Sequence, residues 1–485
     1  MRRRPLLACA LLLGGLAAAQ ASALPSGAPG VSAPVLVTGA TPFPASCSSE
    51  GWQDFVGVES EVSLAVSPRD PSKLATTYMQ DDVVGHPVSR SSDGGQTWQT
   101  TVPAGPTQCS GGDGTAYGVF DPWISYGADG RLYLLSVSSG ESTSTGDQVS
   151  RHAGIQDILA RHIYIHTSDD DGATWQGPFV AGGDVDNGFV LDKPSITADR
   201  LRPGHAYAVW TRINLPTGTA VLGYARSTDG GRTWTEPAQA PLPLGTRGVL
   251  LAPEIHVLPN GDLTLLVAEA RPATLFLAGG IVPGYAQTGL PRQTGQSRFL
   301  TLRSTDAGLT WSREPALVGK VKLFPAVATG AVAPDGTMYA VWSTDQSTSD
   351  SAVMLATSPD GGRTWGAPQT LVAPSRRAIT PAVAVDGTGA IAVTWYDGGA
   401  SRWLARAFVA VSRDRGRTWA ERNMSPTFDL NTAPATNNAG SAYQMGDYEG
   451  LVGLPGGGFV ATYAVARPIA QHGATDVVAT RITLP

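Results

Sequence analysis

The sequence predicts an all-β protein, a β-propeller in which seven four-stranded blades form a ring. Three observations lead to this fold class. The pattern S-x-D-x-G-x-T-W occurs six times, short apolar runs bounded by turns lie between the copies, and the 485 residues include 58 Gly and 36 Pro but only 15% charged residues. Repetition at intervals of tens of residues indicates a repeat architecture, and this composition is typical of repeated β-structure.

Each copy of the eight-residue pattern is predicted to form a hairpin turn. The six copies are Ser91–Trp98, Ser168–Trp175, Ser227–Trp234, Ser304–Trp311, Ser358–Trp365 and Ser412–Trp419. Asp can accept hydrogen bonds from the backbone that follows it, Gly supplies a positive φ, and Thr-Trp begins the next strand with a large apolar anchor. Turn chemistry alone is therefore sufficient to explain all six copies.

Four apolar runs accompany each unit and predict the four strands of a blade. The seven units open at Glu61, Pro122, Pro194, Pro253, Pro325, Pro381 and Tyr448. The opening run continues through a Gly-containing turn into a second run, a third run precedes the S-x-D-x-G-x-T-W turn, and a fourth follows it. Seven openings predict seven blades, with six as the alternative.

Ring closure requires a strand from the other end of the chain. The seventh unit has its third run at Asp476–Leu484 and no fourth run after it, whereas Pro34–Thr38 is strand-like. Pairing these two runs would complete the last blade and remove its exposed edge. We therefore expect residues 24–60 to form an N-terminal segment with a ring-closing strand and residues 61–485 to form the propeller.

The first 23 residues have the pattern of a secretion signal. Arg2–Arg4 form a positive end, Pro5–Ala18 an apolar stretch, and small residues offer a cleavage site near Ala21. We expect a secreted protein, extracellular or periplasmic, without a membrane span. Its net charge changes from −6 to −9 when the three signal arginines are removed, and no basic cluster suggests nucleic acid. We expect a monomer.

Two cysteines remain in the expected mature chain. Cys47 and Cys109 either pair, tying the N-terminal segment to the connection after the first turn, or stay as two free thiols. The seven histidines show no spacing typical of a transition-metal site. We predict no cofactor, with Ca²⁺ bound by acidic residues as the alternative.

Antiparallel geometry predicts which face of the ring carries function. First strands begin and second strands end on one face, around the axial funnel, and the S-x-D-x-G-x-T-W turns lie on the opposite face. Polar residues gather at the funnel positions: Glu61, Asp82, Asp121, Asp192, Lys193, Arg212, Arg376, Arg377, Asp397, Asp447 and Glu449. Carboxylates and guanidiniums in such a ring suit recognition of a polar or anionic glycan, and two opposed acids can hydrolyse a glycosidic bond. The alternative is a polar channel that binds only water.

The repeated pattern is the Asp-box, also called the bacterial neuraminidase repeat, and the chain resembles the sialidase superfamily from about its first box to its last. The fourth unit is the most similar stretch, with Pro253-Glu254, Ala268–Arg271 and Ser304–Trp311. The resemblance implies that Glu254 tunes a nucleophile and that Arg271, with Arg298 as a further candidate, holds a substrate carboxylate.

The same resemblance implies roles for two further positions. Asp81 or Asp82 lies where sialidases carry an acid/base Asp, and Tyr448 lies where they carry a nucleophilic Tyr. A tyrosine nucleophile needs a carboxylate, here Glu254 or Glu449, to accept its proton, because its ordinary pKa is about 10. Where the family has an arginine at the start of the first blade, this chain has Glu61, which would repel a sialic acid carboxylate.

The sequence thus leaves alternatives for function. The first is a secreted, sialidase-like glycoside hydrolase that acts on glycans at the funnel, either by the Tyr/Glu scheme or by two carboxylates, Glu61 or Asp82 with Glu254. The second is a non-catalytic propeller that binds glycan or protein partners. A third is a lyase acting on uronate polysaccharides.

Overall fold

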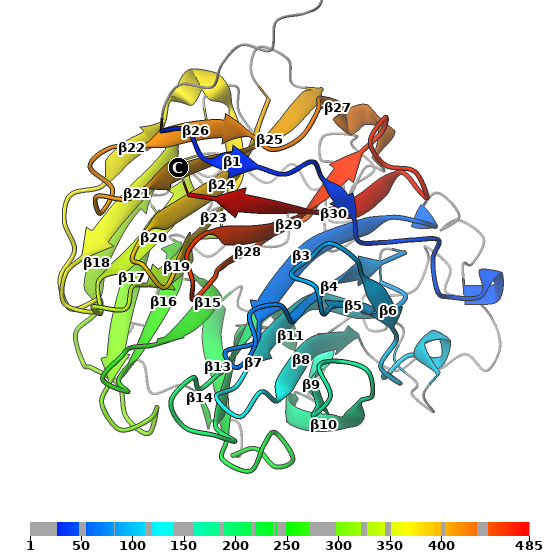
Figure 1. The fold of residues 1–485 in the computed structure, drawn as a ribbon. Coiled ribbons are helices and arrows are strands. Elements are labelled where there is room, and N and C mark those ends of the chain that lie inside the picture. The colour runs from blue at the N-terminus through cyan, green and yellow to red at the C-terminus, as the bar shows by residue number, and fades with distance from the viewer. Residues whose placement is uncertain are drawn as a thin grey trace, which may run out of the picture.

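The chain folds into a ring of seven blades around a central axis (Figure 1). The computed structural model describes residues 27–47, 55–81, 83–111, 116, 118–139, 160–183, 189–214, 219–235, 238–239, 249–270, 297–321, 327–344, 351–398, 403–433 and 445–484. The predicted seven-bladed β-propeller is confirmed, which excludes the six-bladed alternative.

Each blade is an antiparallel sheet whose first strand lies innermost. The first four blades consist of β3 (Glu59–Val66), β4 (Leu74–Gln80), β5 (Val88–Ser91) and β6 (Gln99–Thr101); β7 (Val119–Tyr126), β8 (Leu132–Ser139), β9 (Ala160–Ser168) and β10 (Gln176–Gly183); β11 (Phe189–Ala198), β12 (Ala206–Asn214), β13 (Thr219–Ser227) and β14 (Ala238–Gln239); and β15 (Val249–Val257), β16 (Leu263–Ala270), β17 (Ser297–Ser304) and β18 (Ala316–Val321).

The last three blades follow the same plan. They consist of β19 (Thr329–Val332), β20 (Met338–Ser343), β21 (Val353–Ser358) and β22 (Gln369–Val372); β23 (Ala378–Val385), β24 (Ile391–Asp397), β25 (Leu404–Ser412) and β26 (Ala420–Asn423), with β27 (Phe428–Asp429) beside β25; and β28 (Gly450–Gly453), β29 (Phe459–Ala466) and β30 (Thr475–Thr483). Short 3-10 helices occur at Ala45–Cys47, Gln108–Ser110, Pro374–Arg376 and Leu430–Thr432. In the described part of the chain, no helix has the length and apolar character needed to cross a membrane.

The N-terminal segment completes the seventh blade. Strands β1 (Gly30–Val31) and β2 (Val35–Leu36) both pair with β30, the last strand of the chain (Figure 1). A disulfide between Cys47 and Cys109, whose Cα atoms are 5.8 Å apart, then ties this segment to the connection between the first two blades. Of the two states considered for these cysteines, the structure has the paired one.

The repeated turns hold themselves together through one Ser and one Asp side chain. In the first, the Ser91 hydroxyl donates to Asp93 at 2.8 Å and accepts from Gly95 N at 2.8 Å, and the Thr97 hydroxyl donates to Asp93 at 2.6 Å. The same three bonds recur in the other five turns. Because the Asp oxygens are used within the turn, these residues are structural.

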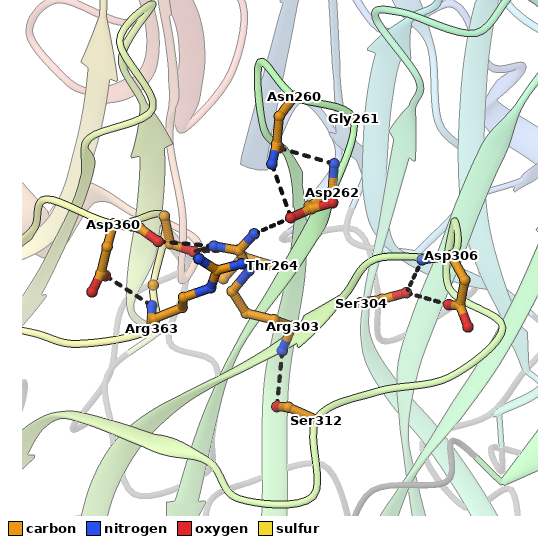
Figure 2. A network of polar contacts seen from close by, with 12 residues as sticks. Asn260, Gly261, Asp262, Thr264, Arg303, Ser304, Asp306, Ser312, Asp360 and Arg363 are labelled. Atoms are coloured by element: carbon orange, nitrogen blue, oxygen red, sulfur yellow. Dashed lines mark hydrogen bonds and ion pairs between the residues drawn. The ribbon is translucent and has the colours of Figure 1, made fainter.

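Arginines link three of these turns to the preceding blade. Arg481, Arg131 and Arg303 donate to the carbonyl oxygens of Gly94, Gly230 and Gly361, at 2.6, 2.9 and 3.0 Å respectively. Each acceptor is the first glycine of an Asp-Gly-Gly sequence. Figure 2 shows the third link, in which the same guanidinium also contacts Asp262 and donates to Asp360 O at 2.8 Å. These bonds fasten adjacent blades on the face that carries the turns.

Hydroxyl groups link the innermost strands around the axis. The Ser63 and Ser125 hydroxyls accept from backbone N–H groups of the next blade, at 3.2 and 3.0 Å. Those of Ser195 and Thr329 donate to backbone carbonyls of the next blade, at 2.7 and 3.3 Å. Buried tryptophans of second strands, including Trp210, Trp342 and Trp395, fill the core within and between blades. The axial surface is therefore polar, whereas the core lies further out in the blades.

Candidate functional site

A bulge recurs where the innermost strands begin, on the funnel face. The pairing register shifts in β3, β7, β11, β15 and β23, and each shift places a non-glycine residue at positive φ. These residues are Glu61 (54°), Asp121 (49°), Lys193 (43°), Ala252 (46°) and Thr380 (50°). Such conformations cost on the order of 1–3 kcal/mol each and bulges redirect side chains, so both features accumulate at functional sites.

Three of these redirected residues meet in one ion cluster at the funnel mouth. The Lys193 ammonium contacts Glu61 at 3.2 Å, Asp121 at 2.9 Å and Asp447 at 2.8 Å. The contacts with Glu61 and Asp121 are hydrogen bonds, and the contact with Asp447 is an ion pair. The partners come from the first, second and seventh blades, and Lys193 belongs to the third. We call these four residues, together with Asp192, the mouth cluster.

The carboxyl groups of the mouth cluster differ strongly in proton affinity. Burial raises the pKa of Glu61 well above its ordinary value, and the neighbouring Asp121 raises it further. Burial and Asp121 likewise raise the pKa of Asp192 to about 8. Asp121 is also buried, but the Lys193 ammonium and hydrogen bonds hold its pKa at about 2. At neutral pH the cluster thus contains a protonated Asp192 beside an ionised Asp121.

Asp447 is the most accessible carboxylate of the mouth cluster. Its side chain is 44% exposed, compared with 10% for Glu61 and 6% for Asp121. The Lys193 ammonium lies between these carboxyl groups. Asp447 is therefore the ionisable group of the cluster that a ligand in the funnel reaches first.

Tyr448 lies beside the cluster but is not joined to either expected carboxylate partner. Its hydroxyl donates to Pro122 O at 3.0 Å, and its ring lies 5.1 Å from that of Trp123. Burial and the negative charge of Glu61 raise its pKa well above its ordinary value. Glu449 instead accepts hydrogen bonds from the Tyr396 hydroxyl and from Ala464 N. This geometry disfavours ionisation of the Tyr448 phenol.

Glu254 lies deeper along the axis, on β15. One of its carboxylate oxygens accepts from Gly330 N of the next blade at 3.0 Å and lies 3.3 Å from Nε2 of His256. It thus links two innermost strands as the axial hydroxyls of other blades do. The only sequence signal for the proximity of His256 to Glu254 is their i, i+2 spacing, which places both side chains on one face of a strand.

Two of the predicted arginines, Arg298 and Arg376, pair with carboxylates outside the mouth cluster. Arg298 pairs with Glu269 on the neighbouring strand. Arg376 pairs with Asp397, also predicted at the funnel, and with Glu421 at 2.9 Å. These pairs belong to the fourth and sixth blades, and both of their arginines are engaged by carboxylates.

Of four further predicted positions, the structure describes Arg377 and Arg212 but not Asp82 and Arg271. Arg377 has a left-handed backbone conformation, and its buried Nε makes no hydrogen bond within the described residues. Arg212 lies near the end of β12 and is partly buried. Asp82 and Arg271 lie outside the described residues. Asp81, the alternative to Asp82, accepts from the Thr41 hydroxyl and Gly57 N, at 2.6 and 2.7 Å, and so holds the N-terminal segment.

A cavity of about 220 Å³ lies on the axis below the mouth cluster. Residues of all seven innermost strands or their flanks line it, among them Trp123, Arg200, Glu254, His256 and Tyr448. None of the five mouth-cluster residues does. The axis therefore carries two distinct polar regions. The sequence did not single out Arg200, His256 or Trp123 for this region.

Comparisons with known proteins agree with the fold. The family described as "BNR repeat-like domain" matches residues 275–449. A sialidase of Bacteroides fragilis is 28% identical over 219 residues, which are 42% of this chain and 38% of that protein. The chain thus spans well under half the length of this relative.

Solved structures with similar chain traces include the Hadza microbial sialidase Hz136, at 14% identity and a TM-score of 0.48, covering 85% of this chain and 73% of that one. The α-L-arabinanase of Penicillium chrysogenum has 13% identity and a TM-score of 0.47, covering 94% and 99%. The six repeated turns, the family match and the sialidase relative support membership of the sialidase/BNR-repeat superfamily of β-propellers.

Proposed function

We propose that this protein is an exported glycoside hydrolase whose reaction takes place at the mouth cluster. Glu61 is the proton donor to the glycosidic oxygen, and Asp447 is the carboxylate that acts on the anomeric carbon. The observation that carries this proposal is the placement of a buried carboxyl group, Glu61, and an exposed one, Asp447, at the same Lys193 ammonium. Burial raises the pKa of Glu61, as a proton donor requires, and glycosidases need one carboxylic acid and one carboxylate together. Export rests on the signal pattern of residues 1–23, which lie outside the described part.

The distance between the two groups supports a mechanism with retention of configuration. The Glu61 and Asp447 oxygens lie 3.2 and 2.8 Å from the same Lys193 nitrogen, so they are at most 6.0 Å apart. Retaining glycosidases have carboxyl groups about 5–5.5 Å apart, whereas inverting ones need about 6.5–9.5 Å to admit a water. Asp447 would then be the nucleophile, and Glu61 would change from acid to base in the second step.

The charges of the cluster favour neutral glycosides over sialosides. A substrate carboxylate at the mouth would meet Asp121 and Asp447, while the Lys193 ammonium already contacts three carboxyl groups. Arg298 and Arg376 are engaged by carboxylates as well. The sialidase relative nevertheless makes sialosides a necessary part of any substrate panel.

A second candidate function follows from the same contacts of Lys193. Its ammonium links residues of four blades, as expected of a residue with a purely structural role. In that case the propeller binds a glycan or protein partner and releases no product.

The test is hydrolysis of a panel of fluorogenic neutral glycosides and a fluorogenic sialoside by the mature protein and three variants. Glu61→Gln should lower turnover about 10²–10⁴-fold for glycosides with poor leaving groups. It should lower turnover much less for dinitrophenyl glycosides, whose leaving group needs no proton. Glu421→Gln, which removes a half-exposed carboxylate from the sixth blade, is the matched control and should retain activity.

Asp447→Asn should abolish turnover of all these substrates, and azide should restore it with inverted configuration. Hydrolysis of the sialoside and of no neutral glycoside would refute the assignment of neutral glycosides as substrates. The sialic acid carboxylate would then have to be bound by an arginine, and Arg377 would be the first to test. If Glu254→Gln were inactive and Glu61→Gln active, the reaction would belong to the axial cavity instead. A folded wild type that cleaves nothing in the panel, yet binds glycan, would support the second candidate.

A further inference from the structure

We infer that the axial cavity is a second ligand site, separate from the mouth cluster. A small hydroxylated carboxylate, of about the size of a sugar acid, enters it from the face that carries the S-x-D-x-G-x-T-W turns. Arg200 binds its carboxylate and Glu254 accepts from its hydroxyls. The inference depends on the cavity, its charges and its opening, and not on catalysis at the mouth.

Arg200 marks the entrance of the cavity. It follows the innermost strand β11, is exposed, and lines the cavity. The connection that carries it contacts the repeated turn of its own blade, because Gly230 N donates to Gly204 O at 2.9 Å. Arg200 therefore lies at the turn-bearing end of the axis, opposite the mouth cluster.

The Arg200 guanidinium makes no hydrogen bond or ion pair with any described residue. Burial lowers the pKa of Arg200, and the charge of the neighbouring Asp199 raises it. The Asp199 carboxylate itself accepts from Arg202 and from the Tyr207 hydroxyl, both at 2.9 Å. Arginine is a rigid planar donor that suits a carboxylate bidentately. A guanidinium on a cavity wall that forms no ion pair with a described carboxylate is thus available to an anionic ligand.

Two carboxyl groups, those of Glu254 and Glu449, also line the cavity, and burial raises the pKa of Glu449 well above its ordinary value. Glu254 is buried and is anchored through one oxygen to Gly330 N, beside His256. The position of Gly330 depends on its lack of a side chain, because a Cβ there would lie 2.5 Å from Nε2 of His256. An anion without hydroxyl groups would be repelled by Glu254. A ligand that also carries hydroxyl donors would bind Arg200 through its carboxylate and Glu254 through its hydroxyls.

The remaining wall suits a ring with an apolar face. Trp123 and Tyr448 line the cavity on its funnel side with rings 5.1 Å apart. The axial hydroxyls of Ser125 and Ser195 are used between blades and offer little selectivity. A volume of about 220 Å³ corresponds to about seven waters of liquid volume, which is room for one small ligand and not for a polysaccharide.

Calorimetric titration of the mature protein tests the inference, with D-glucuronate as the probe. D-glucose has the same ring without the carboxylate, and acetate has the carboxylate without the ring hydroxyls. We expect glucuronate to bind at least tenfold more tightly than either. Arg200→Ala should weaken glucuronate binding at least tenfold, while Arg417→Ala, an exposed arginine on the same face, should not.

Thermal unfolding shows whether each variant is folded, and any glycoside hydrolysis at the mouth should be the same in Arg200→Ala as in wild type. No glucuronate binding by folded wild type at millimolar concentration would overturn the inference. So would equal affinity of Arg200→Ala and wild type, or equal affinity for glucuronate and glucose. Acetate binding as tight as glucuronate binding would refute the role of Glu254 as the hydroxyl acceptor.

Discussion

Replacing Lys193 by methionine should destabilise the propeller in a pH-dependent way. The substitution keeps most of the aliphatic stem and removes the ammonium that contacts Glu61, Asp121 and Asp447. Breaking a buried ion pair by removing one partner costs about 3–5 kcal/mol, because an uncompensated charge stays buried. Lys193 is only 17% exposed and Asp121 only 6%, so this range applies to the free energy of unfolding at pH 8.

The loss should be smaller at pH 5 than at pH 8. Without the ammonium, the pKa of Asp121 rises from about 2, so the carboxyl can take up a proton and escape the penalty of a buried charge. For a chain of 485 residues, an unfolding entropy of about 2.1 cal/mol/K per residue converts 3–5 kcal/mol into a Tm decrease of about 3–5 °C.

Differential scanning calorimetry at both pH values, at one scan rate, measures this effect. Lys73→Met is the matched control, since Lys73 forms a surface ion pair with Asp171 at 2.6 Å, and such pairs contribute little. Equal Tm values for the two variants at pH 8 would refute the assignment of Lys193 as the organising charge of the mouth cluster. A decrease that is the same at pH 5 and pH 8 would refute its electrostatic cause.

Three further predictions concern stability. Arg303→Met should lower the free energy of unfolding by about 2–4 kcal/mol in denaturant titration, because it leaves Asp262 without its buried partner, and Asp262→Asn in the same chain should recover part of the loss. The free energy of unfolding of Asp192→Asn, relative to that of the wild type, should be higher at pH 8 than at pH 5. The folded protein holds the Asp192 proton up to about pH 8, whereas the unfolded chain loses it near pH 4, so the wild type alone loses this stability as the pH rises between these values. Cys109→Ser opens a 62-residue loop closed with Cys47 and should lower stability by about 4 kcal/mol, and reduction of the wild type should have the same effect but leave the variant unchanged.

Much of the architecture was predictable because its signals are local. The S-x-D-x-G-x-T-W turns contain their own hydrogen-bond partners within eight residues, as Asp93 and Thr97 show. The strand runs have their own periodicity, and counting them predicted seven blades. The pairing of β2 with β30 followed from one missing strand at one end and one spare run at the other.

The candidate site was predictable only as a face of the ring. The funnel positions contain Glu61, Asp121, Lys193 and Asp447, which do meet. They also contain Arg376, which is engaged by carboxylates of its own blade, as is Arg298, the candidate that the sialidase resemblance implied. Spacing along the chain cannot separate these cases, because the choice of partner depends on bulges that rotate individual side chains toward the axis.

The sequence by itself determined the repeated turn, the four-stranded blade, the number of blades and the way the ring closes. Each of these depends on contacts between residues close in the chain or on a count of similar units. Only the tertiary structure decided that Lys193 contacts residues 61, 121 and 447, and that Glu254 lies in a cavity with Arg200. Closing a ring brings together positions hundreds of residues apart, and their proton affinities depend on the burial and charges that meet there.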